Sequence, residues 1–311
     1  MAEEYDVIIV GAGPAALSAA IYAGRAEMKT LVLERKYIGG QVTLTWDVAN
    51  YPGFPDGIDG PTLIQQMEQQ ARKFEAEFRT EEVNLVELDG HTKAVTTSAN
   101  EYRCPVLVLA MGADPKHLGV PGEDELRGKG VSYCGTCDGP FFRNKKVVVV
   151  GGGDAALKEG LFLTKFANEL VLVHRRDEFR AEKIYQTEVK ENPKIDLVLN
   201  SVVDRINGAE RVESVDIHNV KTDEKQAIDC DGVFVFIGHA PNTQFLCNVF
   251  PGQCGGEIET VFDMMTSVPG VFAIGDVRKH SYRQIATAVG EGATAAIAAE
   301  HYISKLEAEG S

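Results

Sequence analysis

The sequence predicts an α/β fold, because one strand-helix-strand pattern occurs in it twice. Residues 5–16 read YDVIIVGAGPAA and residues 145–156 read KKVVVVGGGDAA, so each copy is an apolar strand that runs into G-x-G-x-x-A. A helix-like stretch follows each copy, over 17–26 and 157–166, and a second apolar run comes after it. Corresponding positions such as Gly11 and Gly151 lie 140 residues apart. Units of this kind bind dinucleotides, so we expect two Rossmann-like dinucleotide-binding domains.

Each glycine-rich loop has the residue types that a pyrophosphate group requires. The first glycine permits a tight turn, the second lets the pyrophosphate approach the backbone, and a small third residue lets helix and strand pack closely. The pyrophosphate then lies at the helix N-terminus, where free N–H groups favour an anion. One such motif is also compatible with an ordinary glycine turn, but here the strands and helices recur with it. The predicted contacts are Gly11, Gly13, Pro14, Ala15 and Ala16 in the first copy and Gly151, Gly153, Asp154, Ala155 and Ala156 in the second.

The two copies differ at the end of their second strand, where an acidic residue commonly binds a ribose 2′-hydroxyl. The first copy has Glu34 there, which suits FAD or NAD. The second has His174, Arg175 and Arg176, with Arg180 one turn further, and these groups attract a 2′-phosphate. We therefore predict FAD in the first domain and NADPH in the second. The alternative for the basic cluster is a solvated run of charges.

The order of apolar strands indicates that one domain interrupts the other. Strand-like runs end at Gly112 and at Gly238, and a later one over 271–274 delivers Asp276. A loop with Pro115 and Pro121 between the copies is typical of a hinge. We expect the NADPH domain to be inserted into a discontinuous FAD domain, with residues 1–114 as the first part of the FAD-binding domain, 115–243 as the NADPH-binding domain with the cysteine pair, and 244–311 as the second part of the FAD-binding domain.

Cys134 and Cys137 lie just before the second glycine-rich strand, and their C-x-x-C spacing favours thiol–disulfide exchange. Asp138 beside them is a candidate proton donor or acceptor, or part of an Asp-Gly turn. Zinc would need a second Cys or Cys/His pair close by, so we predict no metal site. The remaining cysteines are scattered and are expected to be core residues, with a second pair between the last two left open: Cys104, Cys230, Cys247 and Cys254.

Bulk composition excludes several other classes of protein. The chain has 311 residues and a net charge of -15, which disfavours nucleic-acid binding. No apolar run is long enough for a membrane helix, and the acidic N-terminus does not resemble a signal peptide. We expect a cytoplasmic protein with no membrane and no nucleic-acid partner.

Taken together, these motifs resemble those of the low-molecular-weight bacterial thioredoxin reductases, over nearly the whole chain. The resemblance is carried by residues 11–16, 39–41, 50–53, 134–138, 151–156, 174–181, 275–276 and 282–284. It implies an NADPH-dependent thioredoxin-disulfide reductase that is a homodimer and acts on thioredoxin or a similar dithiol protein. It also implies that Cys137 faces the flavin, that Cys134 attacks the substrate disulfide, and that the inner domain rotates between two poses.

The resemblance further implies a set of nucleotide contacts, and the chain departs from the family's usual residues at four positions. In this chain Ile285 stands where the family commonly has Ala, Gly135 where Ala is more usual, Ala155 where a hydroxyl is frequent, and Lys158 where an acid is frequent. The implied FAD contacts are Glu34, Arg35, Gly39, Gly40, Gln41, Asn50, Val83, Met111, Gly112, Gly275, Asp276, Arg283, Gln284 and Ile285, and the NADPH set also includes Ile237 and Gly238.

Four other functions share parts of this pattern. A ferredoxin-dependent relative lacks the nicotinamide motifs, so the arginines argue against it, and a ferredoxin–NADP reductase lacks the cysteine pair. A dithiol oxidase has no need of a 2′-phosphate site. A nucleotide-sensing module without catalysis does not account for the cysteines.

Overall fold

The protein was analysed as a computed structural model, which describes residues 2–45, 48–88, 90–247, 249–250 and 255–310. The chain divides into two compact units, the first made of residues 1–114 and 240–311 and the second of residues 115–239. The expected second boundary at residue 243 lies slightly later than the one in the structure. The chain passes between the units through β9 (Ala113–Pro115) and β18 (His239–Pro241), which pair with each other.

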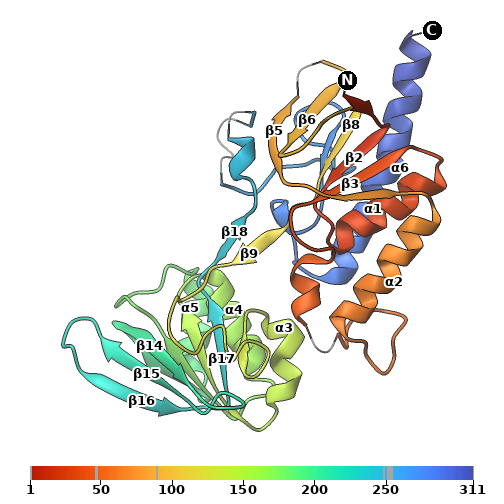
Figure 1. The fold of residues 1–311 in the computed structure, drawn as a ribbon. Coiled ribbons are helices and arrows are strands. Elements are labelled where there is room, and N and C mark those ends of the chain that lie inside the picture. The colour runs from red at the N-terminus through yellow and green to blue at the C-terminus, as the bar shows by residue number, and fades with distance from the viewer. Residues whose placement is uncertain (1, 46–47, 89, 248, 251–254, 311) are drawn as a thin grey trace. The chain divides into compact units, whose positions relative to one another are not determined.

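A parallel sheet forms the centre of the first unit (Figure 1). Its strands run in the order β19-β8-β2-β3-β4, and each neighbouring pair is parallel. Successive side chains of a strand point to opposite faces, so apolar runs such as Val7–Val10 are buried on both. The strands are β2 (Val7–Val10), β3 (Thr30–Glu34), β4 (Glu77–Thr80), β8 (Val106–Leu109) and β19 (Val271–Ala273).

Helices cover one face of this sheet and a smaller sheet lies over the other. Val7 and Ile9 pack toward the helices, whereas Ile8 and Val10 pack toward the smaller sheet, whose order is β1-β7-β6-β5. The helices are α1 (Pro14–Arg25), α2 (Gly60–Lys73) and α6 (Ile285–Gly310), and the strands are β1 (Glu3–Glu4), β5 (Val83–Glu87), β6 (Lys93–Thr97) and β7 (Glu101–Cys104). Short 3-10 turns are η1 (Gly40–Leu44), η3 (Gln244–Leu246) and η4 (Gly275–Val277).

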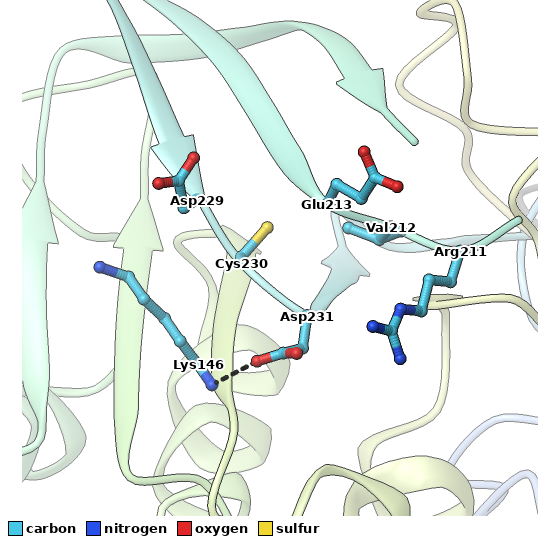
Figure 2. A pocket seen from close by; sticks show the side chains of 7 residues that line it. All are labelled: Lys146, Arg211, Val212, Glu213, Asp229, Cys230 and Asp231. Carbon is cyan, nitrogen blue, oxygen red and sulfur yellow. Dashed lines mark hydrogen bonds between the residues drawn. The ribbon is translucent and has the colours of Figure 1, made fainter. Parts of the chain in front are cut away.

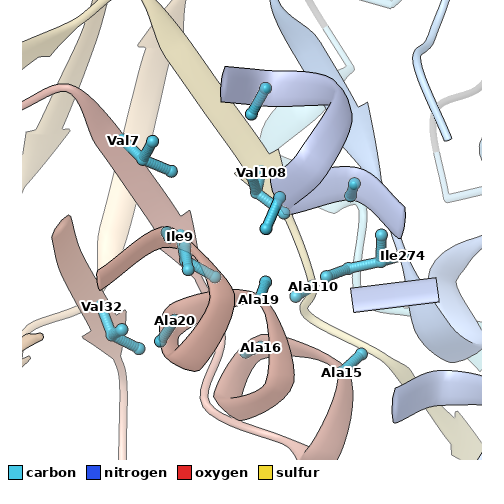
Figure 3. Packing of buried hydrophobic residues seen from close by; sticks show 14 of the residues in the cluster. Val7, Ile9, Ala15, Ala16, Ala19, Ala20, Val32, Val108, Ala110 and Ile274 are labelled. Carbon is cyan, nitrogen blue, oxygen red and sulfur yellow. The ribbon is translucent and has the colours of Figure 1, made fainter. Parts of the chain in front are cut away.

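Small residues allow α1 and α6 to pack at very short range. A side chain at Gly292 would collide with the carbonyl oxygen of Ala15, and Ser18 Oγ donates to the carbonyl of Val289 at 2.8 Å. Figure 3 shows the alanines of α1 beneath Ile9 and Val108 of the sheet. The C-terminal helix α6 therefore completes the first unit, and α6 cannot accept a side chain at Gly292 without moving away from α1.

The second unit repeats the parallel sheet with its own coverings. The strand order is β10-β17-β11-β12-β13, again all parallel. These strands are β10 (Val131–Ser132), β11 (Lys146–Gly151), β12 (Glu169–Val173), β13 (Ile195–Val198) and β17 (Gly232–Phe236). The coverings are the antiparallel strands β14 (Ser201–Asn207), β15 (Ser214–Asn219) and β16 (Lys225–Asp229) on one face, and α4 (Asp154–Leu163) and α5 (Lys183–Glu191) on the other, with α3 (Gly135–Asp138) and η2 (Gly139–Phe142) before β11.

The predicted α/β fold is confirmed, and the element limits differ only locally. The first helix begins at Pro14 rather than at residue 17, because proline is favoured in the first turn of a helix. Within the described residues, none of the helices combines the length and apolarity needed to cross a membrane.

Candidate active site

The loop between β2 and α1 has the geometry of an anion cradle. Gly11 has φ +98°, and a Cβ there would strike the carbonyl of Ala110, so only glycine fits. Gly13 caps α1 without a side-chain hydrogen bond, and an added Cβ there would meet no described atom within 4 Å. The space beside Gly13, at the N-terminus of α1, is therefore open among the described residues, as binding of a pyrophosphate would require.

Glu34, at the end of β3, is held beside this loop. Its Oε2 accepts from the amide of Ala12 at 3.0 Å and its Oε1 from the amide of Lys36 at 3.0 Å. Gly39 also donates its amide to the carbonyl of Ala12 at 2.8 Å. The carboxylate keeps acceptor capacity beyond these two bonds, so its position fits the predicted contact with ribose hydroxyls.

Arg35 and Gln41 share a partner that the sequence did not indicate. Gln41 Nε2 donates to Asp114 Oδ1 at 2.6 Å, and Arg35 Nη2 lies 3.8 Å from Asp114 Oδ2. Gly40 begins η1 directly before Gln41. Asp114 thus holds together two residues predicted to contact the nucleotide, through contacts within the first unit.

The Gly275–Asp276 segment lies against the start of α1, far away in sequence. A Cβ placed on Gly275 would be 3.1 Å from the Cβ of Ala15. The amide of Gly275 donates to Glu291 Oε2 at 2.7 Å, and Glu291 Oε1 pairs with Arg278 Nη2 at 2.7 Å. Glu291 and Arg278 are mostly buried, so they fix the turn that carries Asp276.

Asp276 is largely desolvated at this position. The pKa of Asp276 is raised to about 6, chiefly by burial; Arg283 opposes the rise and Glu291 adds to it. Ser281 Oγ lies 3.5 Å from Asp276 Oδ1, a long hydrogen bond. A carboxyl in such a place is costly unless a ligand with donor groups accompanies it.

The remaining predicted flavin contacts lie around the start of α6 and the end of β8. Asn50 Nδ2 donates to Gln284 Oε1 at 3.1 Å, Arg283 has φ +53° and pairs with Glu257 at 2.6 Å, and Ile285 begins α6. Asn242 bonds both Met111 and Gly112: its side chain donates to the first carbonyl at 3.1 Å and its amide to the second at 3.1 Å. Val83 is different, because its side chain is in the core. Only its backbone is left for a ligand.

The loop between β11 and α4 of the second unit repeats the cradle. A Cβ on Gly151 would lie 2.5 Å from the carbonyl oxygen of Phe236 and 2.6 Å from the Cβ of Ala156, so this turn also demands glycine. Gly153, like Gly13, caps its helix without a side-chain bond. Asp154 Oδ1 accepts from the amide of Glu182 at 2.8 Å, and Ile237 and Gly238 follow the neighbouring strand at the same edge.

His174 follows the end of β12 (Glu169–Val173), at the position that corresponds to Glu34 in the first unit. Its ring is buried, contacts Gly152 and lies within hydrogen-bond distance of the Glu178 carbonyl, 3.1 Å from Nε2. Burial lowers the pKa of this imidazole, and Arg175, Arg176 and Arg180 lower it further. His174 therefore packs beneath the loop, and its contact with a phosphate stays a prediction. The three arginines are exposed and remain available.

Cys134 and Cys137 form a disulfide at the start of α3. Their Cα atoms are 5.3 Å apart, and Cys137 donates its amide to Sγ of Cys134 at 3.1 Å. Asp138 follows Cys137 directly in the chain. Its amide donates to the Cys134 carbonyl at 3.2 Å. Across the described ranges, no group of His, Cys, Asp and Glu residues is arranged to hold a metal ion.

The sequence pattern of the pyridine nucleotide-disulphide oxidoreductases matches residues 5–292. The chain belongs to this family. Membership makes it an oxidoreductase, and it agrees with two nucleotide cradles and a formed disulfide in one chain.

Curated relatives of similar length are named thioredoxin reductase. A thioredoxin reductase of Mycolicibacterium smegmatis is 45% identical over 97% of this chain and 98% of its own length, and one of Bacillus subtilis (strain 168) is 45% identical over 99% and 98%. Among solved structures, thioredoxin reductase from Streptococcus pyogenes MGAS5005 matches with a TM-score of 0.93 at 42% identity, over 98% of this chain and 100% of that one. The Lactococcus lactis enzyme, in a conformation named FR, gives 0.66 at 40% identity, over 97% and 99%.

The free cysteines of the described residues lie apart from the Cys134–Cys137 disulfide. Cys104 and Cys230 are buried, and burial raises the pKa of each to about 12. Thiols of this kind are inert, as expected for core residues. The open question of a pair between Cys247 and Cys254 falls partly on residue 254, which lies outside the described residues.

A cavity of about 300 Å³ in the second unit is separate from these nucleotide features (Figure 2). It lies where β11 and β17 begin, with the amide of Lys146 donating to Asp231 Oδ2 at 3.1 Å. Ligands of parallel α/β sheets bind at the opposite, carboxyl edge. The cavity is thus at the wrong edge of the sheet for a dinucleotide.

Proposed function

We propose that this oxidoreductase is a thioredoxin-disulfide reductase that passes electrons from NADPH through FAD to the Cys134–Cys137 disulfide and then to thioredoxin or a similar dithiol protein. The observation that carries the proposal is the disulfide itself, which lies at the start of α3 in the same compact unit as a second nucleotide cradle. The relatives named thioredoxin reductase, at 45% identity, support it.

FAD is assigned to the first unit and NADPH to the second. Glu34 offers a carboxylate to a free ribose hydroxyl in the first, while Arg175, Arg176 and Arg180 offer cations to a 2′-phosphate in the second. Bound FAD would supply the two-electron carrier between nicotinamide and disulfide. The protein's own part is to hold the pyrophosphates on α1 and α4 and to keep Gly275–Asp276 in place through Glu291.

Roles within the disulfide follow the resemblance. We assign Cys137 to the flavin side and Cys134 to attack on the substrate disulfide, with Asp138 moving the proton that accompanies thiolate formation. A rotation of the second unit, through β9 and β18, would present the disulfide and the nicotinamide to the flavin in turn. Two solved relatives of nearly equal identity match the chain with TM-scores of 0.93 and 0.66, which supports more than one arrangement in such chains.

We also propose a homodimer that acts in the cytoplasm. The dimeric state is carried over from the family resemblance, and the cytoplasmic location rests on the sequence and on the relatives.

Anaerobic flavin spectroscopy tests the proposed function. The purified protein is mixed with NADPH or with NADH, and flavin bleaching is recorded before thioredoxin and a disulfide dye are added. Bleaching by NADPH followed by thioredoxin-dependent dye reduction is expected. A protein that is not bleached by NADPH takes its electrons elsewhere, from ferredoxin for example. Bleaching without any turnover of thioredoxin would point to another acceptor or to a dithiol oxidase.

A further inference from the structure

Glu159 of α4 lies against the first residue of the redox helix α3. A Cβ built on Gly135 would collide with Oε2 of Glu159, and it would also lie 3.4 Å from Cδ of Glu159 and 3.4 Å from Cζ of Phe236. Figure 1 shows α3 and α4 together in the second unit. The carboxyl of Glu159 therefore occupies space that a side chain at residue 135 would take.

The Glu159 carboxyl is poorly satisfied in this position. Its Oε2 is buried without a hydrogen-bond partner. Burial raises the pKa of Glu159, while the amides of Thr136 and Gly135 lower it by a smaller amount. Phe236 of β17 adds an apolar wall. A buried carboxyl with one oxygen unpaired, next to a redox centre, calls for an explanation beyond packing.

The place of this carboxyl matters because reduction makes negative charge nearby. Breaking the Cys134–Cys137 bond gives thiols that ionise, and the amides at the start of α3 are the groups that would stabilise a thiolate. A carboxylate turned toward the same amides competes for them and repels the thiolate. Ionised Glu159 therefore disfavours the dithiol form, whereas protonated Glu159 does not.

We propose that Gly135 and Glu159 form a matched pair that sets the redox balance of Cys134–Cys137: the missing Cβ at residue 135 admits the Glu159 carboxyl to the amide end of α3, where it favours the disulfide. Glu159 is thus a positioning residue for electron transfer. The inference rests on the proposed function only in taking this disulfide as the electron carrier. It also accounts for glycine at a position where Ala is more usual in the resembling family.

The test is the equilibrium of the cysteine pair with dithiothreitol, which requires neither nucleotide nor thioredoxin. The protein's disulfide breaks as dithiothreitol delivers two electrons and two protons and closes its own ring. The dithiol fraction is read by alkylation and mass analysis at pH 8 and at pH 5, in wild type, Glu159→Gln, Gly135→Ala and the double variant. Glu188→Gln, an exposed acid on α5, is the matched control.

At pH 8, Glu159→Gln should shift the equilibrium about 3- to 10-fold toward the dithiol. Gly135→Ala should shift it the same way, because the flexible end of Glu159 moves aside, and the double variant should equal Glu159→Gln. The shift should be smaller at pH 5 than at pH 8, because burial raises the pKa of Glu159 and protonation removes the charge that acts on the sulfurs. Asp138 is the carboxyl of α3 itself, so the pH comparison is repeated in an Asp138→Asn background, where the same shift is expected.

A shift below about 2-fold at pH 8, a shift that is as large at pH 5 as at pH 8, or additive effects in the double variant would each overturn the proposal. Loss of the effect in the Asp138→Asn background would transfer the role to Asp138 and overturn it as well. This experiment does not measure thioredoxin turnover. Its result can therefore be interpreted even if the protein proves not to reduce thioredoxin.

Discussion

At the scale of single residues, the proposed function assigns the choice between NADPH and NADH to Arg175 and Arg176 of the second unit. Hydrogen bonds to charged groups contribute about 1.5–3 kcal/mol each, so replacing both arginines by Ala should raise the KM for NADPH by about 100-fold or more. The KM for NADH should change by less than about 3-fold, since it has no phosphate to lose. Steady-state kinetics with both nucleotides measures the difference.

The control for this pair is Arg211→Ala, an exposed arginine of the same unit that lines the cavity at the other edge of the sheet. It should leave both KM values unchanged. If the double variant weakens NADPH and NADH equally, the arginines are a solvated charge run, as the sequence alone allowed.

Asp276 should make stability depend on pH. Burial raises its pKa from 3.8 to about 6, so the folded protein binds a proton in a range where the unfolded chain releases it. The stability of flavin-free protein should therefore gain as pH falls from about 6 toward 4, and the full penalty is present above pH 6. Asp276→Asn should stabilise that protein by about 1–3 kcal/mol at pH 7.5 and much less at pH 4.5.

Chemical unfolding at both pH values checks this, with the exposed Asp56→Asn as the control. The same Asp276 variant should retain flavin less tightly, because a carboxylate acceptor is lost. Asp276→Asn protein that is no more stable than wild type at pH 7.5 would show that the carboxyl is satisfied by the protein itself.

At the scale of elements, the packing of α6 on α1 should depend on one glycine. Gly292→Ala would force a Cβ into the carbonyl oxygen of Ala15, so it should destabilise the first unit by about 1–3 kcal/mol and lower flavin content. Gly290 of the same helix has open space around it among the described residues, and Gly290→Ala should be neutral or stabilising by up to about 1 kcal/mol. Denaturant midpoints of the two variants decide the matter; equal effects would contradict the close packing.

The parallel strands were predictable because continuous apolar runs such as Val147–Val150 are buried on both faces. The antiparallel strands were not, because they alternate buried and partly exposed residues in short, charged segments such as Ser201–Asn207 and Lys93–Thr97. Their pairing is decided by contacts between strands, and a linear pattern carries little of that information.

Site residues divide in the same way. The glycines of both cradles were predictable since their chemistry is local to one turn. Glu291, Asp114 and Asn242 were missed, because each acts on a segment far away in sequence. The burial of His174 could have been predicted from the sequence. The second copy has Gly152 where the first has Ala12, and that glycine makes room for the buried ring.

At the scale of the whole molecule, the proposed rotation of the second unit should make turnover sensitive to solvent viscosity. If reorientation limits the rate, kcat with thioredoxin should fall roughly in proportion to added viscogen, while the dithiothreitol equilibrium of the cysteine pair should not change. Stopped-flow and steady-state rates in sucrose solutions measure this. A kcat that is independent of viscosity would show that a chemical step limits turnover.

The central claim is that electrons from NADPH reach Cys134 and Cys137 by way of the flavin. The most direct measurement is anaerobic addition of NADPH to the flavin-loaded protein, followed by alkylation and mass analysis of every cysteine. The account predicts that Cys134 and Cys137 become labelled as NADPH is consumed, that Cys104 and Cys230 stay unlabelled, and that flavin-free protein shows no labelling of the pair. A flavin that bleaches with NADPH while Cys134 and Cys137 remain joined would contradict it.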